Sequence, residues 1–485
     1  MIIPFEKSYK TLDWQSLYQA AYGTLKRFNL ALSADEDFTA KTVLRHVPQR
    51  RVVVSGIWRG KKVVAKIFIS PKHSKKHMER EFNGNRLLVQ NKIPTPSLLF
   101  YGATCDKRIH ILIFQCLQHV RSLHALWMDH EHGETAKPQL KAVVIELATQ
   151  HVLGIIQKDL HLKNFLVGRK IVYTLDGAQI THHALKINKK TSINHLALFL
   201  SQLGVGCEGL QKKLFESYAK ARGWLLKPAD TIELFRLIKQ WHEKRWQHFA
   251  EKIFRTSNDF VKRHTWSMLC MSDRAFISPE FNFYLENPEA FFHHPTCQVL
   301  KQGRSATVIK INLNGKALVV KRYNLKNLWH RIRRMTRATR AAVSWRLAHK
   351  LQLFGIKTAK PIAFIEKRFL GLRGTSYYIS EYIQGETAAQ YFERHEETIT
   401  SPMVDRLADL LRNLAKLTIT HGDLKITNII IDEHLAPVLI DLDGTQEHLS
   451  LSSLRTAWRY EIKRFLNNFN HQQALYEQFK LKLEN

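Results

Sequence analysis

Alternating apolar and polar positions predict paired β-strands at the start of two separate stretches of the chain. In the first stretch, Val52–Val54 and Val63–Ile69 are rich in β-branched residues and are separated by a short glycine-containing segment. In the second stretch, Thr307–Leu313 and Ala317–Val320 flank an Asn-Gly dipeptide, which is typical of a tight hairpin turn. Each stretch therefore begins with a predicted β-hairpin.

The pattern then predicts a helix after each hairpin and a second helix farther along. The first helices are the basic segments Ser74–Gln90 and Asn327–Leu353, and the later ones lie near Gln139–Leu153 and Pro402–Leu417. Residues 228–250 have apolar positions at helical spacing and predict a helix that closes the first stretch. Further strands are predicted near Leu98–Tyr101, Ile109–Gln115, Ile362–Glu366 and Tyr377–Glu381. Each stretch reads as a small β-rich lobe followed by a helical lobe.

Four short patterns recur in the same order in both stretches. The most specific has Asp-Leu, then Asn five residues after the Asp, then three apolar residues. The matched pairs are 157–167 with 421–431, 93–96 with 356–359, 63–66 with 318–321, and 174–177 with 441–444. A chance match of one pair is plausible, but a match of all four at nearly constant spacing is not. The sequence therefore predicts two tandem copies of one fold.

The repeat sets the predicted domain boundaries. We expect an N-terminal segment at 1–35, a first copy at 36–265 and a second copy at 298–485. Residues 266–297 separate the copies and are rich in Phe, Pro and Asn, which favours a linker or docking segment.

Composition narrows the compartment and the partners. The chain has 74 Lys+Arg against 42 Asp+Glu, a formal net charge of +32, so we expect an anionic partner such as a nucleotide, a phosphorylated glycolipid, a membrane face or a nucleic acid. Its five cysteines form no Cys-x-x-Cys pair, which argues against a disulfide framework or a cysteine zinc site. The first residues contain no apolar signal core, and no apolar run is long enough to cross a membrane. A cytoplasmic protein is predicted.

The repeated residues are those that phosphoryl transfer requires. A strand lysine can reach nucleotide phosphates, a helix carboxylate can hold that lysine, and a loop Asp can accept the proton of the acceptor hydroxyl. An Asn and a second Asp offer the hard oxygen ligands that Mg²⁺ prefers. The first copy provides Lys66, Glu81, Asp159, Asn164 and Asp176, and the second provides Lys321, Asp423, Asn428 and Asp441. A simple turn at each Asp-Leu motif would explain neither the lysine strand nor the later Asp.

These motifs resemble known kinases. Residues 421–428 with Asp441 resemble the catalytic and metal loops of the protein-kinase-like superfamily. Residues 158–165 with 174–177 resemble a narrower group, the bacterial lipopolysaccharide core kinases of the Kdo and heptose kinase type. The segments 299–308, 319–324 and 355–361 are also similar to that family, and the resemblance covers roughly 45–180 and 298–445.

The resemblance implies an α+β fold with two tandem protein-kinase-like bilobal domains that use ATP and Mg²⁺. It also implies roles for individual residues. Lys66 and Lys321 would bind the ATP phosphates, Glu81 would pair with Lys66, Asp159 and Asp423 would be catalytic bases, and Asn164, Asp176, Asn428 and Asp441 would bind magnesium.

Both copies depart from the family pattern. The first copy has Gln157 where a kinase usually has His, and it lacks a glycine-rich loop. The second copy keeps Gly303, in a turn whose backbone amides could contact phosphate, but has Ser344 where Glu81 aligns. The sequence is compatible with two active copies or with one pseudokinase.

The second metal aspartate has two candidates in the second copy. The Leu-Asp-Gly match aligns Asp443 with Asp176, whereas the spacing of 13 residues from Asn428 favours Asp441. We prefer Asp441 on that spacing.

One segment of the second copy is strongly basic. From Lys321 to Arg346 there are nine Lys/Arg and no acid, with Leu, Trp and Ile interleaved. A solvated helix face is one interpretation, and an interfacial helix on an anionic membrane is the other. Nucleic acid binding is not expected, because no recognition-helix, zinc-finger or RNA-binding signature accompanies the charge.

Together these features predict a phosphotransferase acting on a sugar hydroxyl of the lipopolysaccharide inner core, either heptose or Kdo. The enzyme would lie on the cytoplasmic face of the bacterial inner membrane as a peripheral protein. Two alternatives stay open: a protein or small-molecule kinase of the same fold, and a pseudokinase scaffold that binds anionic membrane.

Overall fold

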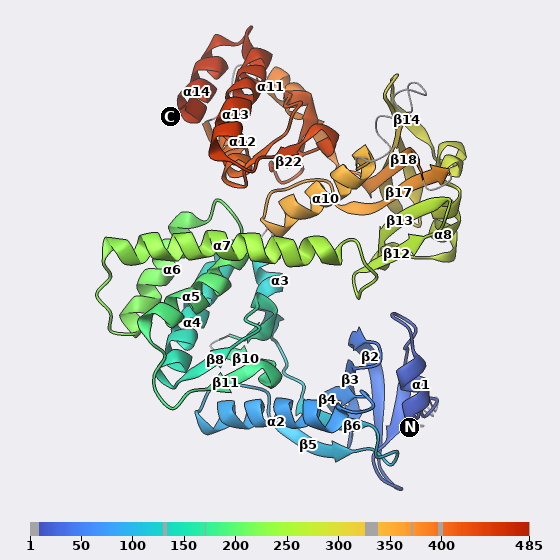
Figure 1. Ribbon diagram of the computed structural model, residues 1–485, viewed down its shortest axis with the longest axis vertical. Coiled ribbons are helices and arrows are strands. Elements are labelled where there is room, and N and C mark those ends of the chain that lie inside the picture. The colour runs from blue at the N-terminus through green and yellow to red at the C-terminus, as the bar shows by residue number, and fades with distance from the viewer. Residues whose placement is uncertain are drawn as a thin grey trace, which may run out of the picture. The chain divides into compact units, whose positions relative to one another are not determined.

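The computed structural model is a mixed α/β protein that divides into two compact units. Unit 1 consists of Met1–Gln202 and Gly209–His242, and unit 2 of Leu203–Glu208 and Glu243–Asn485. The structure describes residues 9–129, 133–169, 171–324, 338–369, 372–395 and 401–484. Each unit combines one large antiparallel sheet with a set of helices (Figure 1).

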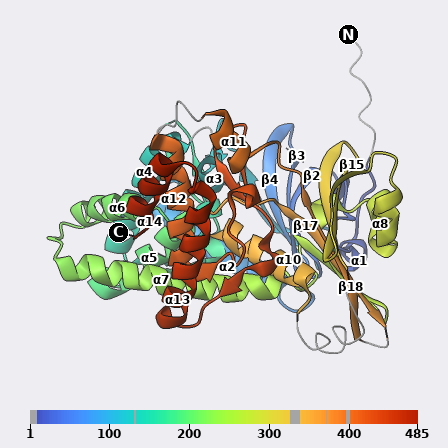
Figure 2. The ribbon, with the colours of Figure 1, turned by 90° about the horizontal axis from the view of Figure 1, so that it is seen from above.

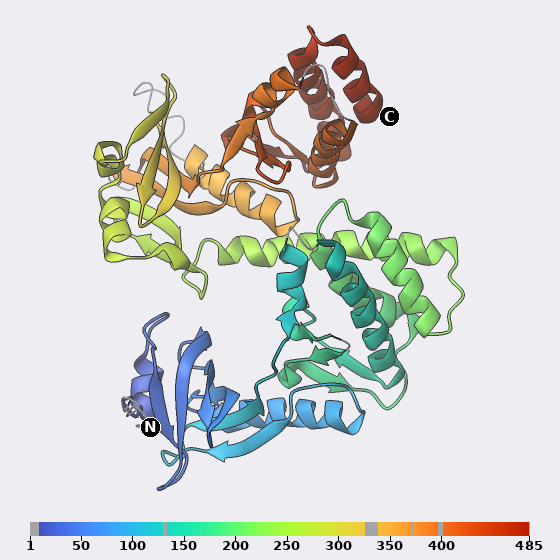
Figure 3. The same ribbon diagram turned by 180° about the vertical axis from the view of Figure 1, so that it is seen from behind.

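The sheet of unit 1 has six strands in the order β1-β2-β3-β4-β6-β5. Strand β3 alternates buried and partly exposed residues, as expected for a strand with one face on a core. The bounds are β1 Phe28–Ala31, β2 Asp37–Val47, β3 Arg51–Trp58, β4 Lys61–Phe68, β5 Leu98–Ala103 and β6 His110–Gln115. Helix α2 (Ser74–Gln90) runs beside this sheet and contacts β4 and β6 (Figure 3).

The described part of the predicted N-terminal segment, residues 9–35, packs onto the first sheet. Helix α1 (Trp14–Gln19) and strand β1 contribute Leu17, Phe28 and Leu30 to the core of the first sheet, where all three side chains are buried. The alternation of Phe28 and Leu30 with polar neighbours places both side chains on one face of an added edge strand.

The rest of unit 1 is mainly helical. The helices are α3 Leu123–Met128, α4 Gly133–Val152, α5 Lys189–Leu200, α6 Glu208–Ala221 and the long α7 Pro228–Lys252, which continues past His242 into unit 2. A short strand, β7 Arg121–Ser122, precedes α3, and four more lie between α4 and α5: β8 Ile155–Gln157, β9 Phe165–Val167, β10 Val172–Thr174 and β11 Ile180–His182. The loop after β8 carries Asp159 and Asn164, and the loop after β10 carries Asp176.

The sheet of unit 2 has seven strands in the order β12-β13-β17-β18-β16-β15-β14. Their bounds are β12 Phe260–His264, β13 Met268–Asp273, β14 Gln298–Gln302, β15 Ala306–Leu313, β16 Lys316–Tyr323, β17 Pro361–Phe369 and β18 Leu372–Glu381. Helix α10 (Arg340–Leu353) contacts β17 and β18, and α8 (Pro279–Glu286) lies near β15 (Figure 2). The part of the predicted basic helix between 325 and 337 lies outside the described residues.

The segment 266–297, which the sequence predicts to be a linker or docking segment, is part of the fold of unit 2. Strand β13 pairs with β17, and Cys270 and Met271 on it are fully buried. Phe281 and Leu285 of α8 and Phe291 after it pack into the core formed with β15 and β16. The aromatic residues that suggested a docking segment instead cover a face of the second sheet.

The remainder of unit 2 is a helical group with short strands. Its helices are α11 Ala388–Arg394, α12 Ser401–Lys416, α13 Leu451–Leu466 and α14 Gln473–Glu484. Its short strands are β19 Gly385–Thr387, β20 Ile419–Thr420, β21 Ile429–Asp432, β22 Pro437–Leu439 and β23 Gln446–Glu447. The loop after β20 carries Asp423 and Asn428, and the loop after β22 carries Asp441. Within the described parts of the chain, no helix combines the length and the apolarity needed to cross a bilayer.

Candidate functional site

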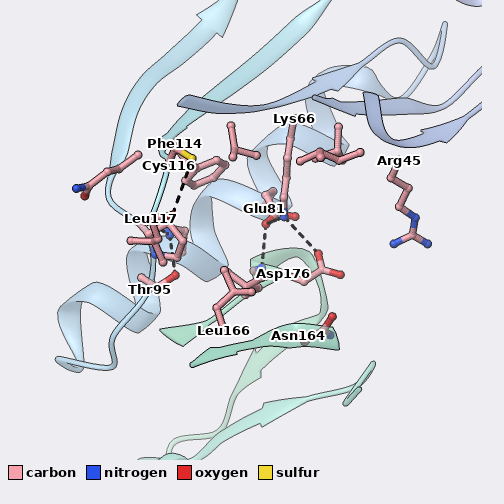
Figure 4. Close-up of a pocket in the computed structure, with 18 of the residues that line it drawn as sticks. Arg45, Lys66, Glu81, Thr95, Phe114, Cys116, Leu117, Asn164, Leu166 and Asp176 are labelled. Atoms are coloured by element: carbon pink, nitrogen blue, oxygen red, sulfur yellow. Dashed lines mark hydrogen bonds and ion pairs between the residues drawn. The ribbon is translucent and has the colours of Figure 1, made fainter. Parts of the chain in front are cut away.

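Three elements of unit 1 meet at one lysine. Lys66 points from β4 toward α2, where its Nζ forms an ion pair with the buried carboxylate of Glu81 (Figure 4). The same Nζ lies 3.7 Å from Asp176 Oδ1. Glu81 Oε1 also accepts a hydrogen bond of 2.9 Å from the backbone N–H of Gly177. Glu81 therefore joins the strand lysine to the loop that carries Asp176.

The loop of Asp159 and Asn164 is held by its own side chains. Asn164 Nδ2 donates to the backbone oxygen of Asp159 at 2.6 Å, which closes the loop across the five-residue spacing. The Asp159 carboxylate is half exposed, and its Oδ1 lies 2.8 Å from His161 Nε2. The hydrogen bond with His161, together with the positive charges of Arg45 and Arg51, holds the pKa of Asp159 below its usual range. Asp159 is thus an ionised acceptor at neutral pH.

Asp176 has a left-handed backbone with a φ of 65°. The preceding residue, Leu175, donates its N–H to the backbone oxygen of Asn164 at 2.8 Å, so the two loops are in register. Burial raises the pKa of Asp176, but the charges of Lys66 and Arg51 outweigh it and leave the pKa below the usual range. The αL conformation is uncommon for a residue with a side chain and occurs mostly where the surroundings impose it.

A cavity of about 370 Å³ adjoins these residues. Lys66, Glu81, Asn164 and Asp176 line one part of it, while Asp159 is not among the lining residues. The other walls are mostly apolar and come from β3, β4, the end of β6 and β9: Val53, Val64, Phe114, Cys116, Leu117 and Leu166. Figure 4 shows Cys116 and Leu117 at one end and Arg45 on the far side of Lys66. A flat aromatic ring fits the apolar end and an anionic tail fits the lysine end.

The cavity is also lined by two arginines that the sequence did not single out, Arg45 and Arg51. Arg45 is near the end of β2 and Arg51 begins β3, so the two residues lie on either side of the turn between these strands. Their signal in the sequence was weak, because arginines are frequent in this chain and the cavity-facing positions depend on a register shift between Val43 and Arg45. The two arginines add positive charge to the wall of the cavity.

The oxygen atoms around Asp176 fit a magnesium ion. Asp176 Oδ1 is buried and has no hydrogen-bond partner among the described residues. The Nδ2 of Asn164 donates its hydrogen bond to the Asp159 backbone oxygen. The side-chain oxygen of Asn164 is therefore the atom that could bind a metal. Carboxylate and amide oxygens are the hard ligands that Mg²⁺ takes alongside phosphate and water.

Unit 2 holds its lysine differently. Lys321 on β16 forms an ion pair with Asp441 and a second one of 3.2 Å with Asp443 Oδ2. Ser344 on α10 is buried and forms a 3.1 Å hydrogen bond with Tyr323 Oη. The carboxylate that the helix supplies in unit 1 is thus supplied in unit 2 by the loop residue Asp443.

The loop backbone of unit 2 repeats that of unit 1. Asn428 Nδ2 donates to the backbone oxygen of Asp423 at 2.9 Å, and Ile440 donates its N–H to the backbone oxygen of Asn428 at 3.0 Å. Asp441 has a φ of 62° and precedes a short 3₁₀ turn, as Asp176 does. By backbone geometry, Asp441 rather than Asp443 corresponds to Asp176.

Gln157 in unit 1 and His421 in unit 2 make equivalent contacts. Gln157 Nε2 donates to the Leu175 oxygen at 3.4 Å, and His421 Nε2 lies 2.9 Å from the Ile440 oxygen. Each acceptor belongs to the residue before the left-handed aspartate. Burial lowers the pKa of His421, so its imidazole is neutral and donates from Nε2.

Helix α13 anchors the loop that carries Asp423 through a buried carboxylate. Glu461 accepts the backbone N–H groups of His421 and Gly422 at 2.8 and 2.7 Å. Burial outweighs these hydrogen bonds and raises the pKa of Glu461 to about 7. On the next turn of α13, Arg464 donates to the Gly422 oxygen at 2.6 Å and to Asp423 Oδ1 at 3.3 Å. Sequence reasoning selected neither residue, because no short motif links them to the loop.

Gly303 does not present its amide to a ligand in this structure. Its N–H donates to the Ala306 oxygen at 3.0 Å, and its carbonyl accepts from Asn324 Nδ2 at 3.1 Å. A phosphate contact by backbone amides of this turn stays a prediction, and it would involve amides other than that of Gly303.

Comparison with known families gives one match. Residues 300–480 match the family model described as Lipopolysaccharide kinase (Kdo/WaaP) family. The matched segment lies in unit 2 and contains its candidate residues, Lys321, Asp423, Asn428 and Asp441. No curated protein matches the chain. The match supports a phosphotransferase related to the kinases of the lipopolysaccharide core.

Proposed function

We propose that the protein is an ATP- and magnesium-dependent phosphotransferase that phosphorylates a heptose or Kdo hydroxyl of the lipopolysaccharide inner core. We further propose that each unit is a protein-kinase-like domain with a sheet lobe and a helical lobe. The family match of residues 300–480 carries the substrate class. The proposed phosphoryl transfer is supported by the ion pair of Lys66 with Glu81, which lies beside Asp176.

In unit 1, the apolar end of the cavity would take the adenine ring and the basic end the phosphates. Lys66 is held in place by Glu81, so it can contact phosphate without losing rotamer freedom on binding. Arg45 and Arg51 add two further cations at the same end. A guanidinium group can donate two parallel hydrogen bonds to two oxygens of one phosphate. Such contacts would hold the phosphate tail of the nucleotide in one position.

Asn164 and Asp176 would hold the magnesium ion. When bound, the ion supplies charge neutralisation of the phosphate oxygens. Asp159 would accept the proton of the acceptor hydroxyl. Its half-exposed carboxylate leaves room for a large acceptor to approach, and His161 at 2.8 Å orients it.

Unit 2 offers the same residues in a more closed arrangement. Lys321 contacts both Asp441 and Asp443, so a metal ion at Asp441 would have to displace the lysine. This favours unit 1 as the main site of phosphoryl transfer. A non-catalytic unit 2 that binds the acceptor is the second candidate arrangement.

Magnesium-dependent ATP turnover tests the proposal. We expect Asp176→Ala in the purified full-length protein to lower turnover about 100-fold or more, because a metal clamp is worth several kcal/mol of transition-state stabilisation. Asp441→Ala should have a smaller effect if unit 2 is not the catalytic unit. Asp35→Ala, at an exposed loop position, is the matched control. Wild-type protein that neither binds nor hydrolyses ATP, with or without lipopolysaccharide, would contradict the proposal.

A null strain tests the acceptor. Its lipopolysaccharide core should lack a phosphate that wild-type protein restores and the Asp159→Ala/Asp423→Ala double variant does not, as read by mass spectrometry of the core. An unchanged core in the null strain would exclude the sugar acceptor. Phosphate transfer to casein-like proteins or aminoglycosides would then favour a different acceptor for the same fold.

A further inference from the structure

A cavity of about 430 Å³ lies in unit 2 at the N-terminal end of helix α10. Its walls come from the first turn of α10, the end of β16, the start of β18 and the loop after Asp441. Helix α10 contacts β17, β18 and this loop, so three elements far apart in sequence converge here (Figure 1). The polar lining includes Thr339, Arg340, Arg373, Ser376, Asp443 and Thr445.

The charge of this lining is positive. Asp443 is its only carboxylate, and that carboxylate already has Lys321 at 3.2 Å. Arg340 Nη1 is 3.9 Å from Asp443 Oδ2, a long contact that leaves most of its donors to other partners. Arg373 Nε lies 3.4 Å from the buried Glu366.

The carboxylate of Glu366 is shared. It also accepts two hydrogen bonds from Arg368, at 2.8 and 3.0 Å, and one from the Thr339 hydroxyl at 3.1 Å. One carboxylate thus pairs with two arginines, and the guanidinium of Arg373 lies at the cavity wall.

A buried hydroxyl in the lining has no hydrogen-bond partner. Thr445 is 6% exposed, and its Oγ1 makes no hydrogen bond within the described residues. Burying an unsatisfied hydroxyl is unfavourable, so such groups in a cavity commonly meet a ligand or water. The helix adds a favourable field, because the N-terminus of α10, capped by Thr339, carries partial positive charge.

The equivalent positions of unit 1 lack these features. Counting four residues from the left-handed aspartates, Thr445 corresponds to Ile180. Counting four residues before Glu81 and Ser344, Arg340 corresponds to His77. The orphan hydroxyl and the arginine are therefore specific to unit 2 rather than demanded by the shared backbone.

We propose that this cavity binds a phosphate group, with Arg340 and Arg373 pairing its charge and Thr445 Oγ1 donating a hydrogen bond. The group can be the phosphate of a sugar phosphate or the free dianion. If the proposed function holds, a phosphate already present on the acceptor is the natural occupant. The binding itself does not depend on that function.

Calorimetric titration of the full-length protein without nucleotide tests the site. The probes are glucose 6-phosphate, inorganic phosphate and, as the uncharged control, glucose. We expect both phosphates to bind and glucose not to bind. Arg340→Gln should weaken phosphate binding about 10-fold or more, as expected for loss of a charge-assisted hydrogen bond. Arg455→Gln, an exposed arginine of α13, should leave it unchanged.

Thr445→Val separates a ligand contact from a structural role. The valine keeps the volume and removes the hydroxyl, so we expect about 5-fold weaker phosphate binding with no fall in melting temperature, because the hydroxyl has no partner to lose. Tighter binding of glucose 6-phosphate than of phosphate assigns the site to a sugar phosphate, and equal binding assigns it to the free dianion. Unchanged phosphate affinity in both Arg340→Gln and Thr445→Val, or a valine variant that melts markedly lower, would overturn the proposal. Wild-type protein that binds phosphate at this cavity but does not turn over ATP would count against the proposed function alone.

Discussion

Gln157 and His421 show that two different side chains can support the same loop. Each is buried, and each donates to the carbonyl before a left-handed aspartate. The contact needs one uncharged N–H donor at a fixed position. A glutamine amide and a neutral imidazole both provide such a donor. The departure at Gln157 is therefore no argument against activity in unit 1.

Substitutions at Gln157 test this equivalence. Gln157→Ala removes the donor to the Leu175 carbonyl and should destabilise unit 1 by about 1–3 kcal/mol, the usual cost of an unpaired buried polar group. It should also lower magnesium-dependent turnover by loosening Asp176. Gln157→His keeps a donor and should retain more of both properties. Chemical denaturation and turnover measure the two effects, and an alanine variant as stable as wild type would refute the supporting role.

Arg45 and Arg51 predict a distinct binding pattern. If they hold the phosphate tail, Arg45→Gln and Arg51→Gln should each weaken ATP binding about 10-fold, as expected for loss of a charge-assisted contact. Adenosine has no phosphate, so its affinity should not change. Arg59→Gln, an exposed arginine paired with Glu36, is the control. Equal losses for ATP and adenosine would show a general disturbance of the cavity instead.

The residues that the sequence identified differ from those it missed in a physical way. Asp159 and Asn164 lie in one motif whose spacing closes a short loop, and Lys66 and Asp176 lie in short motifs that recur in the second copy, so a pattern in the sequence marks each of them. Arg51 and Glu461 reach their sites through sheet register and helix packing, which involve residues far apart in the chain. The exchange of the helix carboxylate for Asp443 was missed for the same reason, since it depends on a contact across 122 residues.

At the level of elements, helix α2 lies very close to the loop that carries Asp176, and the closest approach is at Gly84. A Cβ built on Gly84 would lie 1.9 Å from the Gly177 oxygen, so even alanine would push the helix away. The same loop amide is the donor to Glu81. Small residues at this crossing therefore keep Glu81 within reach of Lys66.

Gly84→Ala should consequently separate Glu81 from Lys66. We expect a loss of stability of about 1–3 kcal/mol from overpacking, with reduced ATP turnover. Gly209→Ala provides a matched control, because Gly209 is also helical and has no atom within 4 Å of the added carbon. That change should be neutral or slightly stabilising. Thermal unfolding and turnover of both variants measure the difference, and a Gly84→Ala protein with wild-type activity would contradict the close packing.

Helix α13 gives unit 2 a pH-dependent anchor. The pKa of Glu461 rises from an ordinary 4.5 to about 7 in the fold, so the native state retains a proton that the unfolded state has lost between these values. The stability contributed by this group is therefore complete below pH 4.5 and is lost as the pH rises through 7. The total effect is up to about 3 kcal/mol.

Glu461→Gln removes this titration. The stability of wild type minus that of the variant should fall as the pH rises from 5 to 8, because only the wild type loses stability when Glu461 ionises, as measured by denaturant unfolding at each pH. Glu433→Gln changes an exposed glutamate and should give a difference that does not vary in this way. A wild-type minus variant difference that is constant with pH would show that Glu461 is ionised throughout.

The predicted hairpins, the first helix of unit 1 and the described part of the first helix of unit 2 correspond to observed elements because their signals are local. Strand β15 meets β16 through an Asn-Gly turn, and both central residues have positive φ, at 51° and 72°. Strands β12 and β13 were not anticipated, because their burial pattern is irregular and β13 is stabilised by pairing with β17, almost 100 residues later. Long-range pairing extends the second sheet beyond what local periodicity can indicate.

At the scale of the whole molecule, the excess of positive charge is the property that the candidate sites do not account for. The chain carries +32, whereas the two candidate sites are a mixture of lysines, arginines and carboxylates. A charge of this size attracts anionic surfaces over about one Debye length and loses that effect at high salt. It therefore supports, at this scale, the proposed action on a membrane-bound acidic glycolipid.

Binding to lipid vesicles tests that role of the charge. Vesicles with anionic lipid should bind the protein at about 0.05 M salt and release it at about 0.5 M, where charges are screened within a few ångströms. Replacing Arg331, Arg333, Arg334 and Arg337 by Gln should weaken binding about 10-fold or more, since each basic residue near the surface is worth about 1 kcal/mol. These four arginines lie outside the described residues.

The matched control replaces four exposed lysines of unit 1, Lys212, Lys213, Lys220 and Lys239, so that the net charge falls equally. Equal losses in the two variants would show that net charge alone drives binding, and equal binding to neutral vesicles would contradict the electrostatic origin.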